Sequence, residues 1–261
     1  MRSLWTQAAK AERPGCAATG IKRWLKLGAM ATFLTALPGC QNMTAGMPAA
    51  QVRIIDTSAD APELDIYEGG SVLAYNLGFG TVSSYVSIPP GGTAVSAHQA
   101  GMKSQLTTLR GSFAASGHYT VLLSSVTGAL SETVLADQSI PAPAGLASVR
   151  VLEQSRRGAG GVDVYLVRSG STLAGVQPIA ANAAPGGGGE YVNVPAGSYR
   201  VVVLAAGTVP SGSAVPIYSG ATVEFGSGSA RTLILLDGQE SEERRMQMIT
   251  AEDYDPGAVA E

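Results

Sequence analysis

Residues 52–67 read VRIIDTSADAPELDIY, and this stretch sets the secondary structure that we expect along the chain. It has a short apolar run at each end, and a turn signal between them in which Asp60 precedes an Ala-Pro pair. In the second run Leu64 and Ile66 fall on one face and alternate with polar residues, a period of two that is typical of a β-strand. We predict two strands here, with Asp60 capping the turn by accepting backbone N–H hydrogen bonds.

The same pattern occurs a second time farther along the chain. The matched runs are 52–55 with 149–152, 64–67 with 162–165, 85–89 with 191–195 and, more loosely, 119–123 with 232–236. The offset between the copies grows along the chain, as expected for a duplicated domain, because loops tolerate insertions that packed strands do not. We therefore predict an N-terminal extension with a signal peptide at 1–39, a tether at 40–50, domains at 51–145 and 146–253, and a tail at 254–261.

Both copies favour an all-β fold. The chain holds 33 Gly and 14 Pro, which argues against a helical bundle because these residues interrupt helices. Short alternating runs separated by Gly, Pro, Ser and Asn predict two tandem antiparallel β-sandwiches of immunoglobulin type, and an open barrel would have the same signature. Residues 239–245 could form a helix, but the repeat favours a last strand at 244–249.

The first forty residues have the pattern of a secretory signal. Basic residues at 22–26 precede an apolar core at 27–37, which is too short to span a bilayer as a helix. The end of this segment resembles the lipobox of bacterial lipoproteins, with Leu37 three residues before Cys40 and Gly39 at the small position. This resemblance implies acylation of Cys40 (palmitate among the acyl chains) and a lipid anchor in the cell envelope. Gln41 resembles the default signal for the outer membrane.

The charge of the chain after this segment excludes several partners. Residues 40–261 hold 11 Lys and Arg and 19 Asp and Glu, a net charge of 11 − 19 = −8. A surface of this sign does not favour nucleic acid or electrostatic binding to anionic lipid. We expect membrane contact through the lipid anchor alone.

Residues 52–67 also resemble the opening of the domain of unknown function 4397 family, which has a strand, an Asp-Ala-Pro turn and a Val-Asp-Val-Tyr-like strand. Residues 191–199 resemble a later part of the same family, an aromatic-led strand that ends in Pro-Ala-Gly and is followed by a Tyr-led strand. The resemblance implies an exported bacterial β-sandwich and brings no activity with it.

Several polar groups of the sequence are candidate sites. Four carboxylates crowd into one short segment, but their spacing is not that of a calcium loop, so we expect no metal: Asp56, Asp60, Glu63 and Asp65. His98 and His118 have no counterpart in the second copy, which speaks against a shared catalytic role. The run 186–189 is four glycines without a following Lys-Ser or Lys-Thr, so we expect a flexible loop and no phosphate site.

These observations predict a lipid-anchored envelope protein with a structural or adhesive role, no catalysis and no cofactor. Tyrosines recur at matched strand positions, and Tyr85 and Tyr191 are the aromatic residues that we expect to contact a ligand. An envelope protein or a glycan is the expected partner. The alternatives are a glycan- or peptidoglycan-binding module and an envelope hydrolase that uses His118.

Overall fold

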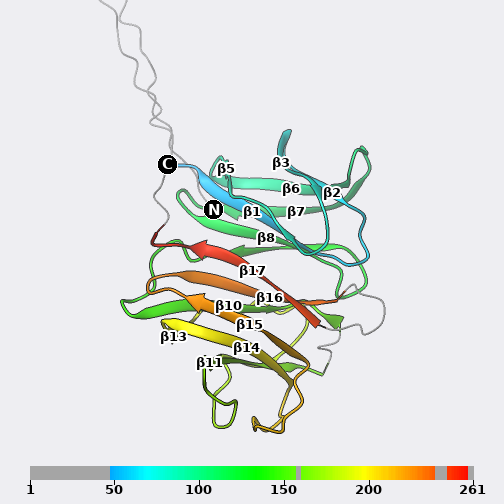
Figure 1. Cartoon of the computed structure of the whole chain (residues 1–261). Helices are drawn as coiled ribbons and strands as arrows, with labels where there is room; N and C mark the ends of the chain where they lie inside the picture. The colour runs from blue at the N-terminus through cyan, green and yellow to red at the C-terminus, as the bar shows by residue number, and fades with distance from the viewer. Residues whose placement is uncertain (1–47, 157–159, 239–245, 258–261) are drawn as a thin grey trace, which may run out of the picture. The chain divides into compact units, whose positions relative to one another are not determined.

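The computed structural model describes residues 48–156, 160–238 and 246–257, and the regular elements within these ranges are β-strands that build four sheets (Figure 1). The predicted all-β sandwich fold is confirmed. In the described ranges, no helix has the length and apolar character needed to cross a bilayer.

The first sandwich consists of sheets A and B. Sheet A has the order β4-β1-β8-β9, with β5 also paired to β1: β1 (Ala50–Thr57), β4 (Thr81–Val82), β5 (Val86–Ile88), β8 (His118–Ser124) and β9 (Ser131–Ala136). Sheet B has the order β3-β2-β6-β7: β2 (Leu64–Glu68), β3 (Ser71–Leu77), β6 (Gly91–Gln99) and β7 (Gln105–Phe113).

The second sandwich consists of sheets C and D. Sheet C has the order β13-β10-β16-β17: β10 (Leu146–Glu153), β13 (Val192–Pro195), β16 (Ala230–Asp237) and β17 (Met246–Tyr254). Sheet D has the order β12-β11-β14-β15: β11 (Val162–Arg168), β12 (Ala180–Ala183), β14 (Gly197–Ala205) and β15 (Tyr218–Phe225).

The two sandwiches share one topology, except that β4 of the first has no counterpart in the second. Sheets B and D are antiparallel throughout, and sheets A and C each contain one parallel pair, β1 with β8 and β10 with β16. A parallel pair needs a crossover connection, and the intervening strands provide it in both copies. The last strand runs to Tyr254, beyond the predicted end at residue 249, and the predicted start at residue 244 and the segment 239–245 lie outside the described residues.

Each sandwich has its own apolar core, because alternate residues of a strand point to opposite faces. In β1, Val52 and Ile54 pack inside the first sandwich, and in β10, Val149 and Val151 pack inside the second. The other face of β1 and β10 is buried as well. Six buried side chains from sheets A and C form a third cluster between the sandwiches: Ile55, Leu122, Leu152, Ile234, Leu236 and Ala251.

Candidate functional site

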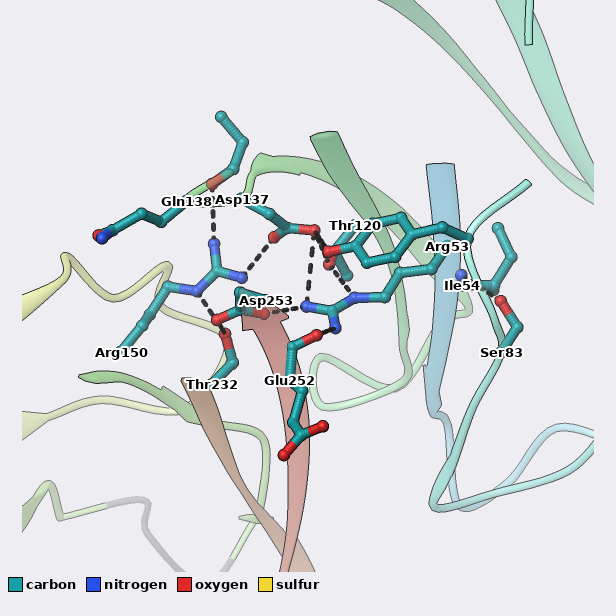
Figure 2. Close-up of polar contacts among 12 residues, drawn as sticks. Arg53, Ile54, Ser83, Thr120, Asp137, Gln138, Arg150, Thr232, Glu252 and Asp253 are labelled. Carbon is teal, nitrogen blue, oxygen red and sulfur yellow. Dashed lines mark hydrogen bonds and ion pairs between the residues drawn. The ribbon is translucent and has the colours of Figure 1, made fainter. Parts of the chain in front are cut away.

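A buried polar cluster lies beside this apolar contact, and its first member is Arg53 on β1 (Figure 2). Arg53 points away from the core of the first sandwich and is 2% exposed. Its Nε donates to Thr120 Oγ1 (2.9 Å), its Nη1 to the carbonyl oxygen of Glu252 (2.8 Å), and its Nη2 to a carboxylate oxygen of Asp253. Arg53 therefore joins its own sandwich to strand β17 of the other one.

Arg150 on β10 makes the same set of contacts in the opposite direction. Its Nε donates to Thr232 Oγ1 (3.0 Å), its Nη1 to the carbonyl oxygen of Ala136 (3.0 Å), and its Nη2 to Asp137 Oδ1 (2.6 Å). Asp137 directly follows β9, so this arginine joins the second sandwich to the first.

The two aspartates complete the exchange. Asp137 Oδ2 accepts hydrogen bonds from Tyr85 (2.8 Å) and Thr120 (2.7 Å), both in its own sandwich. Asp253 Oδ2 accepts from Tyr191 (2.8 Å) and Thr232 (2.7 Å) in the same way. Each aspartate is thus held by its own sandwich and pairs with the arginine of the other, which resembles the reciprocal pattern of a two-fold interface. Asp137 Oδ2 also lies 3.5 Å from Arg53 Nη2. We call these eight residues the interdomain lock: Arg53, Tyr85, Thr120, Asp137, Arg150, Tyr191, Thr232 and Asp253.

Tyr85 and Tyr191, the predicted ligand-contact residues, belong to the interdomain lock. The guanidinium carbon of Arg53 lies 4.9 Å from the centre of the Tyr85 ring, and that of Arg150 lies 4.7 Å from the Tyr191 ring. Both side chains are partly exposed. The structure gives them a cation–π contact and a buried hydroxyl, and their contact with a ligand stays a prediction.

The electrostatics of the lock are those of mutually paired buried charges. Burial raises the pKa of the Asp253 carboxyl, and Arg53 and Arg150 oppose this shift. Burial by itself would lower the pKa of Arg53, but Asp137 and Asp253 more than offset it and raise the pKa. Burial raises the pKa of the Tyr85 and Tyr191 hydroxyls, which therefore stay protonated and donate to the aspartates. Each buried charge of the lock therefore has an opposite charge or a hydroxyl donor beside it, an arrangement that stabilises the contact between the sandwiches.

An open cleft of about 630 Å³ borders the lock where the segment 82–85 of the first sandwich faces β15, β16 and β17 of the second. Its polar lining includes the buried Arg53 and the exposed Ser84 and Thr250. Arg231 also lines it and donates from Nη2 to Glu252 Oε1 (2.7 Å). The cleft offers hydroxyl, guanidinium and carboxylate groups to a polar partner.

The carboxylates at 56–65 have separate roles. Asp60 forms an exposed ion pair with Arg156, and Asp65 accepts N–H hydrogen bonds from Asn76 (3.0 Å) and Gly101 (2.9 Å). The sequence predicts that Asp60 caps the 58–62 turn, but the contact that the structure gives its carboxylate is the ion pair with Arg156. Asp56 binds the N–H and hydroxyl of Ser58 through Oδ1. Among the described residues, no group of three or more His, Cys, Asp or Glu side chains could hold a metal ion.

The role of Asp65 recurs in the second sandwich. Asp163 accepts N–H hydrogen bonds from Asn182 (2.7 Å) and Gly207 (2.9 Å). Asn76 and Asn182 both have positive φ, a conformation that Asn tolerates better than most residues. The repeated aspartate therefore fixes a left-handed turn in each copy.

The two histidines, His98 and His118, have different neighbours. His98 Nε2 lies 3.2 Å from Ser96 Oγ, and its Nδ1 lies 3.3 Å from the carbonyl oxygen of Lys103. His118 packs against the Tyr85 ring with 5.1 Å between ring centres. In a catalytic Ser-His-Asp set a carboxylate would contact the Nδ1 atom of the histidine, whereas at His98 this contact is made by the carbonyl oxygen of Lys103.

The repeated tyrosines do not form one exposed row. Tyr165 and Tyr199 are buried in the second sandwich, whereas Tyr119 packs edge-on against Phe113 in the first. Cys40, Leu37 and Gly39, the predicted lipidation signal, lie outside the described residues.

Fold and site together define an all-β protein of two sandwiches that are joined by the interdomain lock. Residues 50–165 match the family model described as "Domain of unknown function (DUF4397)". The match begins at the first residue of β1 and ends within β11, so it includes β10 and the first part of β11 from the second sandwich.

No curated protein matches the chain. Among solved structures, the chain is similar to CBMbc, a family 26 carbohydrate-binding module of Amy13K from Eubacterium rectale, crystallised with maltoheptaose. The TM-score is 0.24 at 11% sequence identity, and the match covers 80% of this chain and 98% of the module.

Proposed function

We propose that this chain is a lipid-anchored, non-catalytic protein of the bacterial cell envelope that presents two rigidly joined β-sandwiches to an envelope partner. Cys40 would carry the anchor, and the segment 40–50 would tether the sandwiches to the membrane, most simply the outer membrane. The lipobox pattern at 37–40 supports the anchor, and the interdomain lock supports the rigid presentation.

The single observation that carries the structural role is the reciprocal pairing of Arg53 with Asp253 and Arg150 with Asp137. All four side chains are almost fully buried. Charges in such a place are costly unless their partners stay in position, so the pairing ties the orientation of one sandwich to that of the other. A fixed orientation is what a spacer or adhesive protein requires.

Replacing Cys40 by Ser should move the protein from the membrane fraction to the soluble fraction. Several acyl chains, at about 0.8 kcal/mol per buried methylene, hold a protein on a bilayer, and a serine hydroxyl does not receive them by this route. The measurement is membrane fractionation together with mass spectrometry of the N-terminus. Cys16→Ser is the matched control and should stay in the membrane fraction; an unmodified Cys40 in the native protein would contradict the anchor.

A glycan is the partner that the cleft beside the lock favours, since its lining offers hydroxyl and charged groups at an open surface. Ser84→Trp should fill the cleft and abolish binding to isolated peptidoglycan or envelope glycans in a pull-down. Ser112→Trp, on the exposed side of β7, is the control for an added tryptophan. Equal binding by both variants would rule out the cleft. Tyr85→Ala is less informative because it also opens the interdomain lock.

A further inference from the structure

The second sandwich contains a cavity that the proposed function does not use. It measures about 250 Å³ and lies between sheets C and D, at the edge formed by β12 and β13. Its walls are mainly aliphatic side chains and backbone from β10, the segment 179–184 and the glycine loop 187–189, with Val149, Val151, Ile179, Ala183 and Val192 among them. It has room for roughly eight atoms the size of a water molecule, at about 30 Å³ each.

Glu153 is the polar group of the inner wall. It follows Val149 and Val151 on the same face of β10, so its side chain points between the sheets of the second sandwich, and the residue is 1% exposed. Oε1 accepts the N–H of Ser155 (2.6 Å), whereas Oε2 is buried and has no hydrogen-bond partner among the described residues. A buried carboxylate oxygen without a partner is costly, and a bound donor would remove that cost.

The glycine loop is built to close one end of this cavity. Gly186 N–H donates to the carbonyl oxygen of Glu153 (2.8 Å), which fixes the loop to β10. A Cβ at Gly189 would lie 2.0 Å from the carbonyl oxygen of Val151, so only glycine allows the chain to pass this close. The loop that the sequence marks as flexible is therefore packed against the strand that carries Glu153.

The charges around the cavity are negative. Glu153 lies within and the exposed Glu190 lines the mouth, and no Lys, Arg or His is among the lining residues. Burial raises the pKa of Glu153 to about 7; Ser155 opposes the shift, and Asp237 on β16 adds to it. An incoming cation would supply the countercharge that this carboxyl lacks.

We propose that this cavity binds a primary ammonium group carried on a short aliphatic chain, with Glu153 as its countercharge and the aliphatic walls around its methylene groups. Glu190 would attract the cation at the mouth. The chemistry fits either a lysine side chain of another polypeptide or a free alkylamine. The proposal does not depend on the lipid anchor or on the cleft beside the interdomain lock.

The test is isothermal titration of the full chain with n-pentylammonium at pH 8, where Glu153 is ionised. We expect a Kd on the order of 1 mM, and no measurable binding of the isosteric neutral n-pentanol. Affinity should fall by about tenfold per pH unit below pH 7, because the carboxyl must first release its proton. Nα-acetyl-lysine methylamide separates the two sources: binding by this compound points to a lysine side chain, and binding by pentylammonium alone points to a free amine.

Glu153→Gln should weaken pentylammonium binding by about 10- to 100-fold, since the amide keeps the shape and loses the charge. Asp56→Asn is the matched control, because it neutralises the carboxyl at the corresponding position of the first sandwich, and it should bind like the wild type. Equal binding of pentanol and pentylammonium, unchanged binding by the Glu153 variant, or no binding to the wild-type chain at about 20 mM would each overturn the proposal.

Discussion

Replacing Arg150 by Met should lower the free energy of unfolding by about 3–5 kcal/mol, the largest effect that we expect from a single substitution. The methionine fills much of the same volume but leaves Asp137 without its cross-sandwich partner. Asp137 would then be a buried carboxylate close to the apolar contact between sheets A and C. Arg53→Met should act alike on Asp253, because each arginine pairs with the aspartate of the other sandwich.

Urea unfolding at pH 7 measures this effect. Arg156→Met is the control: it removes the exposed ion pair with Asp60, whose side chains are 45% and 59% exposed, and should cost less than about 1 kcal/mol. The double variant Arg150→Met/Asp137→Leu should lose much less than the sum of its single variants, because the buried carboxylate that lost its closest cation is gone. Additive losses, or an Arg150 variant as stable as the Arg156 control, would show that the lock does not join the sandwiches.

The repeat in the sequence predicted several of the strands, because four runs of the first copy have readable counterparts in the second. Leu64 and Ile66 alternate with polar residues, and they form β2 as expected. The parallel pairing of β1 with β8 was not predicted, since the period of two gives the face of a residue and says nothing about which strand lies beside it.

The contact between the sandwiches is visible in the sequence as pairs of consecutive apolar residues, which the alternation of apolar and polar residues does not explain. Ile54 and Ile55 are adjacent and both buried: Ile54 lies in the core of the first sandwich and Ile55 between the sandwiches. In the same way Leu235 lies in the core of the second sandwich and its neighbour Leu236 between the sandwiches. Consecutive apolar residues in a strand indicate burial on both faces.

The interdomain lock was only half readable from sequence. Arg53 and Arg150 occupy the same place in matched apolar runs, and a repeated arginine there indicates a buried partner. The partners themselves lie 200 and 13 residues away along the chain, in segments whose alignment is loose. Pairing Asp253 with Arg53 therefore needs the coordinates. For the same reason the hydroxyls of Tyr85 and Tyr191 could be placed only by the structure.

Stability should fall by about 3 kcal/mol or more as the pH rises from 4.5 to 8, although many proteins are most stable near neutral pH. Burial raises the pKa of Glu153 from an ordinary 4.5 to about 7 and does the same for Glu132 on β9. Between these values the folded protein keeps the protons while the unfolded chain releases them. The stabilisation is therefore fully present below pH 4.5 and is lost as the pH rises through 7.

The measurement is the urea-derived free energy of unfolding across this pH range. Glu153→Gln should flatten the curve, because an amide does not titrate, and should make the protein more stable than the wild type at pH 8. Glu132→Gln should remove a further part of the slope, whereas Asp60→Asn, at an exposed position, should leave it unchanged. Burial also raises the pKa values of Asp253 and Asp56, and these shifts act in the same direction. A wild-type free energy of unfolding that rises with pH would contradict this prediction and would show that a countercharge stabilises the ionised Glu153. Repeating the measurement with and without n-pentylammonium tells whether a bound ammonium ion supplies that countercharge.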